Sequence, residues 1–165
     1  MPIRISIKIT VPDEILNARD VRNAIIRAQQ RDTGPGIRHL FEQTVTGWNN
    51  PPDFEMHQEI TNDRIAMQVY PIGINAEQYK LVNMGSPAHM VPRQPGFLRF
   101  QTGYRSSTRP RIIGSRAFAR YGPYATALQV HHPGFEARAF DEVIGEQYDP
   151  IFQQEMQDAI SSVHP

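Results

Sequence analysis

Residues 54–71 read FEMHQEITNDRIAMQVYP and predict a β-hairpin. On both sides of a turn, every second side chain is apolar or uncharged, which is the period of a strand with one buried face. These positions are Phe54, Met56, Gln58 and Ile60 before the turn and Ile65, Met67 and Val69 after it. Thr61, Asn62 and Asp63 separate the two runs, and such residues favour tight turns. We therefore expect two antiparallel strands here.

The segments before this hairpin predict another strand and two helices. Residues 3–11 alternate apolar and polar side chains, which indicates a strand with one buried face. Asp13 is a suitable N-cap for a helix that continues to about Arg31, because apolar residues recur in it at spacings of three and four. Residues 33–36 contain two glycines and a proline, so we expect them to separate this helix from a short amphipathic helix over residues 37–47.

The segments after the hairpin predict a short helix, an extended arm and a long C-terminal helix. Residues 76–84 form the short helix, which a Gly-Ser-Pro sequence ends. From Arg138 onwards, apolar residues step by four between Phe140 and Ile160, which indicates an apolar stripe on a helix. Pro150 interrupts this stripe, so the helix is expected to be kinked there or split into two collinear helices.

These elements predict an α+β fold in one domain, residues 1–165. A small antiparallel sheet packs against an N-terminal helix and a long C-terminal helix, and a β-arm projects over approximately residues 86–131. Within the arm, FLRF at residues 97–100 forms a compact strand, and residues 125–130 are its expected return partner. Residues 104–124 lie between them and form a loop of unusual length, which we interpret as part of the projecting arm. A surface loop without a role is the alternative.

The composition excludes several classes of protein. The chain has no cysteine, which rules out disulfides, thiol chemistry and thiolate zinc sites. No apolar run approaches the roughly 20 residues that a membrane-spanning helix needs, and the alternating N-terminus is unlike a secretory signal. We therefore expect no membrane partner.

The formal net charge is zero, but the two signs are separated along the chain. Residues 80–120 contain no Asp or Glu and eight Lys or Arg residues, whereas acidic residues dominate after His132. Such asymmetry concerns the partners of a protein more than its fold. The basic residues concerned include Arg109, Arg111 and Arg116, and the acidic ones include Asp141, Glu142 and Glu146.

Histidine pairs are the most obvious candidates for chemistry, and both have a simpler interpretation. His131 and His132 are adjacent, and adjacent side chains on a strand point to opposite faces, so they cannot easily share a metal. His57 and Glu59 form the H-x-E triplet of zinc deaminases, but the cysteine ligands that must accompany it are missing. We interpret the triplet as one polar strand face.

Two glycine-containing segments also lack the features of a catalytic or phosphate-binding site. Ser86 does not lie in a G-x-S-x-G sequence and is better explained as a turn residue. Residues 34–36, Gly-Pro-Gly, have no G-K-[ST] continuation and do not form a phosphate loop. We therefore predict no enzyme, no metal site and no cofactor.

Two short motifs flank the arm. They comprise Tyr79, Val82, Asn83, Gly85 and Ser86 before it and His132, Pro133, Gly134, Ala137, Arg138 and Phe140 after it. In this order, with FLRF between them, they resemble the neck or tail-completion (head-tail joining) proteins of long-tailed bacteriophages. The resemblance implies a structural virion protein, made in the host cytoplasm, that contacts neck and tail-tube proteins. It also implies a homo-oligomeric ring, expected to hold six copies, at the head-to-tail junction or the top of the tail tube.

The residues predicted to act in such a ring fall into three groups, and we predict an intersubunit contact in which Arg109, Arg111 and Arg116 of one copy meet the acidic helix of its neighbour. The arm interface comprises Arg93, Phe97, Leu98, Arg99, Phe100, Arg105, Arg109, Arg111, Arg116 and Arg120. The acidic helix contributes Asp141, Glu142 and Glu146, and the arm hinges are Gly85, Ser86, Pro133, Gly134 and Arg138. Glycine at both ends permits the sharp turns by which the arm leaves and re-enters the domain. Arg138 is expected either to pair with a carboxylate or carbonyl at the arm's base or to remain solvated.

A nucleic-acid-binding module is the alternative function. The arm interleaves arginines with aromatic residues, and single strands are commonly held by stacking beside basic groups. The neutral charge of the whole chain argues against a dedicated binder, although passive contact with DNA in a channel fits both functions. A small hydrolase that uses the histidines is a more distant possibility.

Overall fold

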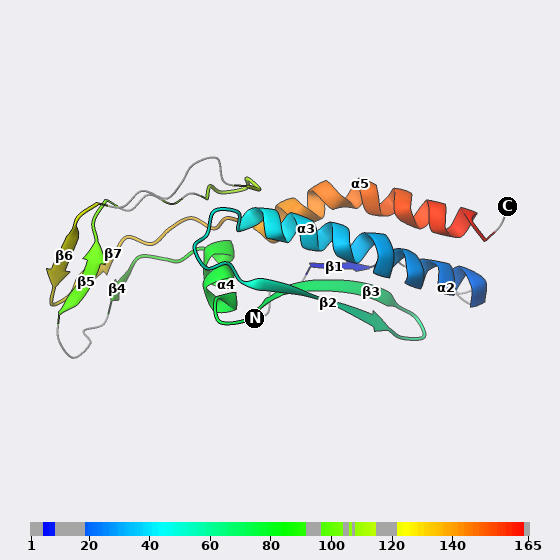
Figure 1. Cartoon of the computed structure of the whole chain (residues 1–165), viewed down its shortest axis with the longest axis horizontal. Helices are drawn as coiled ribbons and strands as arrows, with labels where there is room; N and C mark the ends of the chain where they lie inside the picture. The colour runs from blue at the N-terminus through cyan, green and yellow to red at the C-terminus, as the bar shows by residue number, and fades with distance from the viewer. Residues whose placement is uncertain are drawn as a thin grey trace.

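The computed structural model describes residues 5–8, 19–91, 97–103, 106, 108–114 and 122–163, of which residues 5–8 are described by their backbone alone. The protein has the predicted α+β fold, with a body of long helices and a small sheet. An arm of short strands projects from one end of this body (Figure 1).

A three-stranded antiparallel sheet forms one side of the body, in the order β1-β3-β2. Its strands are β1 (Ile5–Lys8), β2 (Asp53–Ile60) and β3 (Ile65–Ile72). The predicted hairpin is confirmed, because β2 pairs with β3 from Ile60↔Ile65 to Asp53↔Ile72. In the turn, the Thr61 hydroxyl donates to the Asp63 carboxylate at 2.8 Å. The remainder of the strand predicted over residues 3–11, and the cap at Asp13, lie outside the described residues.

Residues 33–36 do not separate two helices, and that prediction was wrong. Three helical segments form one 26-residue helix: α2 (Arg19–Ala28), the π-helical η1 (Gln29–Thr33) and α3 (Gly34–Thr44). Gly34 is helical, with φ −59° and ψ −55°, and its N–H donates to the Gln29 carbonyl across the wide π turn. Pro35 is the second residue of α3, lies within this continuous helix directly after the wide turn, and has no N–H to donate to the preceding turn.

The two glycines of this segment allow close packing. A Cβ atom on Gly36 would lie 2.4 Å from the hydroxyl oxygen of Tyr148, and one on Gly34 would lie 3.1 Å from the sulfur of Met56. The helix consequently approaches Tyr148 on α5 and Met56 on the sheet closely, and a larger residue at either position would require these side chains to shift. The Gly-Pro-Gly sequence predicts a helix break, but in the structure its glycines lie where the helix packs against α5 and the sheet.

The long C-terminal helix is α5 (Phe140–Ser161), and it contains Pro150 without a break. The alternative of two separate helices is therefore wrong. Figure 1 shows that α2 and α3 run towards the arm and that α5 returns away from it alongside them. The two helices contact each other along their length, α3 contacts β2 and β3, and α5 contacts β1. The start of α5 thus lies at the root of the arm.

A cluster of aromatic rings fills the core at the same end. Tyr79 of the short helix α4 (Ala76–Met84) is fully buried. Its ring centroid lies 5.3 Å from that of Phe54 and 5.9 Å from that of Phe140, and Phe41 lies 5.2 Å from Phe54. The Thr44 hydroxyl donates to the Tyr79 hydroxyl at 3.1 Å. This cluster joins the sheet, α3, α4 and the first turn of α5 where the arm begins.

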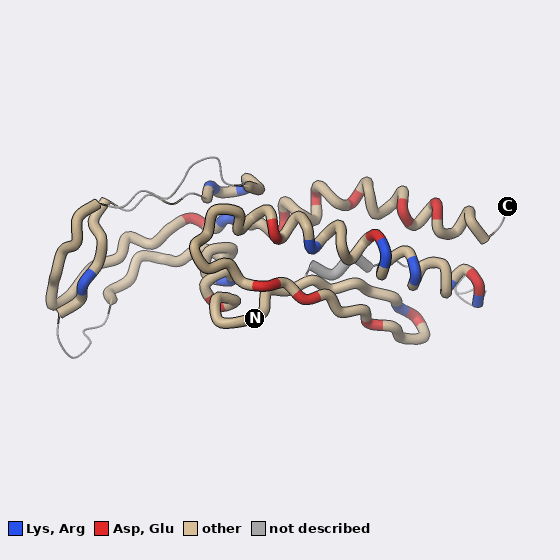
Figure 2. The backbone as a smooth tube through the Cα atoms, in the orientation of Figure 1, with Lys and Arg blue, Asp and Glu red and all other residues tan. Residues whose placement is uncertain are grey.

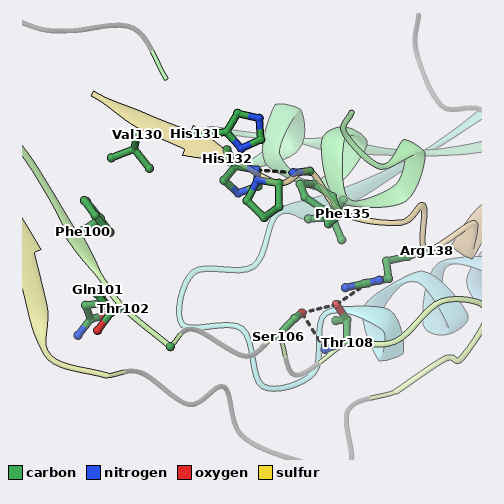
Figure 3. A pocket seen from close by; sticks show the side chains of 14 residues that line it. Phe100, Gln101, Thr102, Ser106, Thr108, Val130, His131, His132, Phe135 and Arg138 are labelled. Carbon is green, nitrogen blue, oxygen red and sulfur yellow. Dashed lines mark hydrogen bonds between the residues drawn. The ribbon is translucent and has the colours of Figure 1, made fainter. Parts of the chain in front are cut away.

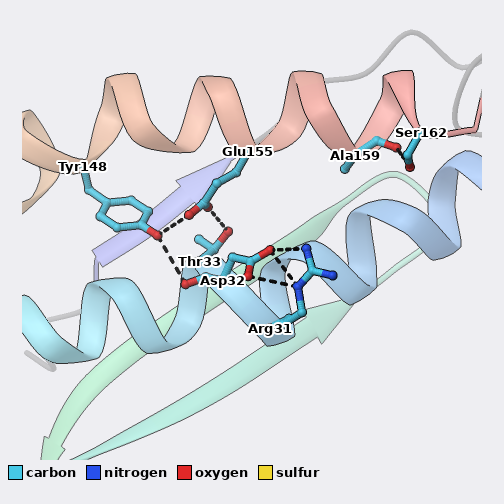
Figure 4. A network of polar contacts seen from close by, with 7 residues as sticks. All are labelled: Arg31, Asp32, Thr33, Tyr148, Glu155, Ala159 and Ser162. Carbon is cyan, nitrogen blue, oxygen red and sulfur yellow. Dashed lines mark hydrogen bonds and ion pairs between the residues drawn. The ribbon is translucent and has the colours of Figure 1, made fainter.

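A polar network links the two long helices farther from the arm (Figure 4). The Tyr148 hydroxyl lies 2.7 Å from a Glu155 carboxylate oxygen and 3.3 Å from the Asp32 carbonyl, and Thr33 donates to Glu155 at 2.6 Å. Burial and the hydrogen bond to Glu155 raise the pKa of Tyr148 above its usual value. The π turn places Asp32 and Thr33 against α5, so η1 takes part in this helix contact.

Candidate functional site

The arm is built from two short antiparallel ladders. At its base β4 (His89–Val91) pairs with β7 (Val130–His132), and farther out β5 (Leu98–Gln101) pairs with β6 (Tyr124–Ala127). The predicted partnership of FLRF with residues 125–130 is correct for residues 125–127, which pair with Leu98, Arg99 and Phe100. Val130 instead belongs to the second ladder. Figure 1 shows β5 and β6 at the end of the molecule opposite the C-terminus.

One glycine lies on each strand beside the backbone bridge where the arm leaves the body. Ser86 and Phe135 exchange both backbone hydrogen bonds, at 3.0 and 2.9 Å. Gly85 and Gly134 beside this bridge have φ values of 75° and 78°. A Cβ on Gly85 would lie 2.6 Å from the Ala137 nitrogen, and one on Gly134 would lie 2.4 Å from the Ser86 oxygen. Only glycine fits at both positions, because the backbone is left-handed and the other strand is too close.

Asn83 fixes the start of α5 from a different helix. Ala139 precedes α5 in a left-handed conformation and has no side chain that can cap it. The buried Asn83 side chain accepts from the Phe140 N–H at 2.6 Å and donates to the Asp141 carboxylate at 2.8 Å. Its backbone carbonyl accepts from the Ala139 N–H at 3.0 Å. Asn83 thereby ties α4, and with it the outgoing arm, to the returning chain.

Residues 108–114 fold back from the arm onto the body, and we call them the strap. The Arg111 N–H donates to the Arg138 carbonyl at 2.8 Å, and the Arg138 guanidinium donates to the Thr108 hydroxyl at 3.2 Å. Thr108 is buried, and Ile113 packs against the core. The prediction that residues 104–124 project as part of the arm is therefore wrong for this described section. These hydrogen bonds join residues about 30 apart along the chain, and no sequence pattern indicates them.

Arg138 lies at the junction of arm and strap. Besides Thr108, its guanidinium binds the Glu136 carbonyl at 3.2 Å, and its own N–H donates to the Val82 carbonyl at 3.2 Å. Arg138 was expected to pair with a carboxylate or carbonyl or to remain solvated, and the structure shows pairing with a carbonyl. Pro133, another predicted hinge residue, precedes Gly134 and leads the chain out of β7.

The basic arm meets the acidic helix within one chain at Arg111. Its guanidinium binds Glu142 at 2.9 Å and Glu146 at 2.7 Å. The hydrogen bond to Glu146 and that carboxylate's charge raise the pKa of Arg111. Asp141 instead binds Asn83. Figure 2 shows that acidic residues are spread along α5, with no Lys or Arg on it.

Two of the remaining predicted arginines lie among the described residues. Arg109 is exposed on the strap. Arg99 of β5 is exposed, and its guanidinium carbon lies 4.4 Å from the centre of the Tyr124 ring. The other four, Arg93, Arg105, Arg116 and Arg120, lie outside the described residues.

The outer part of the arm presents large apolar side chains to solvent. Phe97 is 73% exposed, and Met90, Tyr124 and Leu128 are about half exposed or more. Leu98 and Phe100 are half-buried, so Phe97 is the predicted anchor most available for a partner. Such a group of exposed apolar residues on a projecting element is typical of an interaction site.

A cleft of about 640 Å³ lies between the arm and the strap (Figure 3). Phe100, Val130 and Phe135 contribute apolar side chains to its lining. On one side Ser106 contacts Thr108 at 2.8 Å, and Thr108 binds Arg138 as described above. The sequence contains no Asp or Glu from residue 78 to residue 135, so the arm strands bring no carboxylate to this cleft.

The histidines near the cleft have structural partners. His89 and His132 are opposite each other in the β4–β7 ladder, and their rings stack 5.0 Å apart. The Gly134 N–H donates to Nδ1 of His132 at 3.0 Å. His131 is exposed. In the part of the chain that the structure describes, no three metal-ligating side chains converge.

The other candidates for chemistry are also explained by the fold. Ser86 lies 3.4 Å from Nδ1 of His89, but the His89 ring also lies 3.0 Å from the Pro87 carbonyl. Among the described residues, no carboxylate hydrogen-bonds to this pair, as a catalytic triad would require. Glu59 accepts hydrogen bonds from Arg64 and Gln68, which assigns it to the sheet surface.

Comparisons with known proteins add no assignment. The chain matches no protein-family model, and it has no significant match among curated proteins or solved structures. Over the described ranges, no helix is long and apolar enough to cross a membrane.

Proposed function

We propose that this protein is a structural subunit of a phage neck or tail ring, assembled by laying the arm of one copy on its neighbour. The motif resemblance supports the proposal, because its residues occupy the two ends of the arm's base. Asn83, Gly85 and Ser86 lie on the outgoing side, and Gly134 and Arg138 lie on the returning side. These residues fix where the arm leaves the body.

The observation that carries the proposal is the exposed apolar surface of the arm. Phe97, Met90, Tyr124 and Leu128 lie away from the core and are too exposed to contribute much to folding of one chain. In a head-to-tail interface they would lose contact with water, and aromatic side chains supply much of the affinity of such interfaces. Exposed charges such as Arg99 and Arg109 would set orientation and association rate.

Size-exclusion chromatography with light scattering, together with electron microscopy of the purified chain, tests the proposal. Phe97→Ser should shift assembly to at least about tenfold higher protein concentration, because it removes one large apolar anchor. Ile74→Ser is the matched control, since Ile74 is 95% exposed but lies on the body before α4. A chain that stays monomeric at every concentration, or a Phe97→Ser variant that assembles like the parent chain, would contradict the proposal.

Direct binding of nucleic acid is the second candidate, and the acid-free arm favours it. The Arg99–Tyr124 pair could stack on a base, and no Asp or Glu lies between residues 78 and 135 to repel phosphate. The two carboxylates that bind Arg111 reduce this basic character. Titration of single-stranded DNA at two salt concentrations distinguishes the candidates, because retention that depends on Arg99 and falls steeply with salt supports binding.

A further inference from the structure

The strap binds the body of its own chain, whereas the proposed ring requires the arm to lie on a neighbouring copy. In one chain the strap joins the far part of the arm to the first turns of α5. An arm that moves onto a neighbour must therefore either release the strap from its own α5 or remain held against its own body. The inference that follows rests on the proposed ring.

The contacts of the strap are of a kind that can be released. Arg111 and its partners are largely exposed: 51% of the Arg111 side chain, 65% of Glu142 and 66% of Glu146. Ion pairs with this exposure stabilise a fold only weakly. Arg111 also has a left-handed backbone, with φ 55°, which is unfavourable for a residue with a Cβ. In the strap Thr108 is buried, and Pro110, Ile113 and Gly114 are partly buried.

The surface that receives the strap is the same in every copy. It consists of Glu142 and Glu146 on one side of α5 and of the Arg138 carbonyl just before that helix. A strap from a second copy would find the same ion pairs and the same backbone acceptor. Exchange between copies would therefore form the same kinds of contact and leave Arg111, Glu142 and Glu146 paired.

We propose that the strap is exchanged on assembly: in the ring, Arg111 of each copy binds Glu142 and Glu146 of its neighbour. Each copy in a closed head-to-tail ring gives one strap and receives one, so all these contacts are kept. A monomer closes on itself, and this self-contact delays association until a neighbour competes for it. The arm and strap then form one continuous interface.

Paired charge reversals test the exchange directly. One chain carries Arg111→Glu, and a second carries Glu142→Arg with Glu146→Arg. Within either chain the strap faces a like charge, and like-charge contacts are strongly unfavourable. In an alternating ring of the two chains, every strap faces an opposite charge. Each variant alone should therefore need at least about tenfold more protein to form rings, and an equimolar mixture should assemble at the concentration of the parent chain.

Two controls make every outcome informative. Circular dichroism of each variant checks that it folds, which the exposure of all three positions favours. A third variant with all three reversals in one chain restores the contact whether it forms within or between chains. If this variant assembles but the mixture does not, the contact is intramolecular and the exchange is wrong, while the proposed ring stands.

Two further results would also overturn the exchange. Reversal variants that each assemble as readily as the parent chain would show that the strap has no part in the interface. A parent chain that never forms rings would remove the proposed function and the exchange with it.

Discussion

Asn83→Ala should destabilise the protein far more than the loss of one side-chain hydrogen bond on a surface. Asn83 is 3% exposed, and its amide oxygen accepts from the N–H groups of Phe140 at 2.6 Å and Asp141 at 3.3 Å. Ala139 cannot replace it, because alanine has no side-chain acceptor. The substitution would therefore leave the first N–H of a 22-residue helix buried without a partner.

The expected size of the effect follows from two contributions. The unpaired, buried Phe140 N–H costs about 1–3 kcal/mol, and the lost hydrogen bond from the Asn83 amide to the Asp141 carboxylate costs about a further 1 kcal/mol. We therefore expect the free energy of unfolding to fall by about 2–4 kcal/mol, measured by urea denaturation at neutral pH. The arm should also lose protection from hydrogen exchange at β4 and β7, because Asn83 joins both sides of its base.

Exchanging the side chains of Asn83 and Asp141 distinguishes loss of the helix cap from general disruption of the core. Asn83→Asp keeps the acceptor but places a second carboxylate beside Asp141, so it should be destabilising as well. Adding Asp141→Asn restores one donor and one carboxylate in the same place and should recover most of the lost stability. A loss below about 0.5 kcal/mol for Asn83→Ala, or no recovery in the double variant, would refute this account of the cap.

Three further predictions follow from the fold. Gly36→Ala should destabilise the chain by about 1 kcal/mol or more, because its Cβ would meet Tyr148, whereas Gly145→Ala, whose Cβ meets open space, should stabilise α5 by about 0.5–1 kcal/mol. Burial raises the pKa of Tyr79 and Tyr148, so stability should be complete below about pH 10 and fall as the unfolded chain ionises above it. Tyr79→Phe with Tyr148→Phe should flatten this alkaline decline in urea titrations. Elemental analysis of the purified protein should find no stoichiometric metal, and a metal that is lost in a His89→Ala, His131→Gln, His132→Gln variant would contradict this.

The parts of the fold that follow from local pattern are predictable from the sequence. The hairpin of β2 and β3 combines a period of two with turn residues, and both act within about ten residues of chain. The apolar stripe of α5 is predictable for the same reason. The pairing of FLRF with residues 125–127 joins residues 25 to 29 positions apart, but each of the two strands has a local pattern of its own. The glycines at the arm's base are identified because no other residue adopts their backbone easily.

The parts that depend on contacts between distant residues are not predictable in this way. Gly34 and Gly36 resemble a helix stop, and only the positions of Met56 on the sheet and Tyr148 on another helix show that they permit packing. Thr108 has no pattern that indicates burial, although it holds Arg138. The charge pattern indicates that basic and acidic segments meet, but sequence alone does not distinguish contact within a chain from contact between chains.

The π turn at η1 also sets the phase between the two halves of the long helix. Val21, Ile25 and Ala28 face the core before it, and Ile37 and Phe41 face the core after it. A π turn contains one residue more than an α turn, so it offsets the sequence repeat by one position and both halves keep their apolar side inwards. Deleting one residue from 29–33 should therefore convert the turn to α-helix and keep α3 in phase with α2, whereas closing the turn to α-helix at its present length would rotate α3 by about 100°. In the second case Ile37 and Phe41 would leave the core, so the extra residue and the wide turn depend on each other.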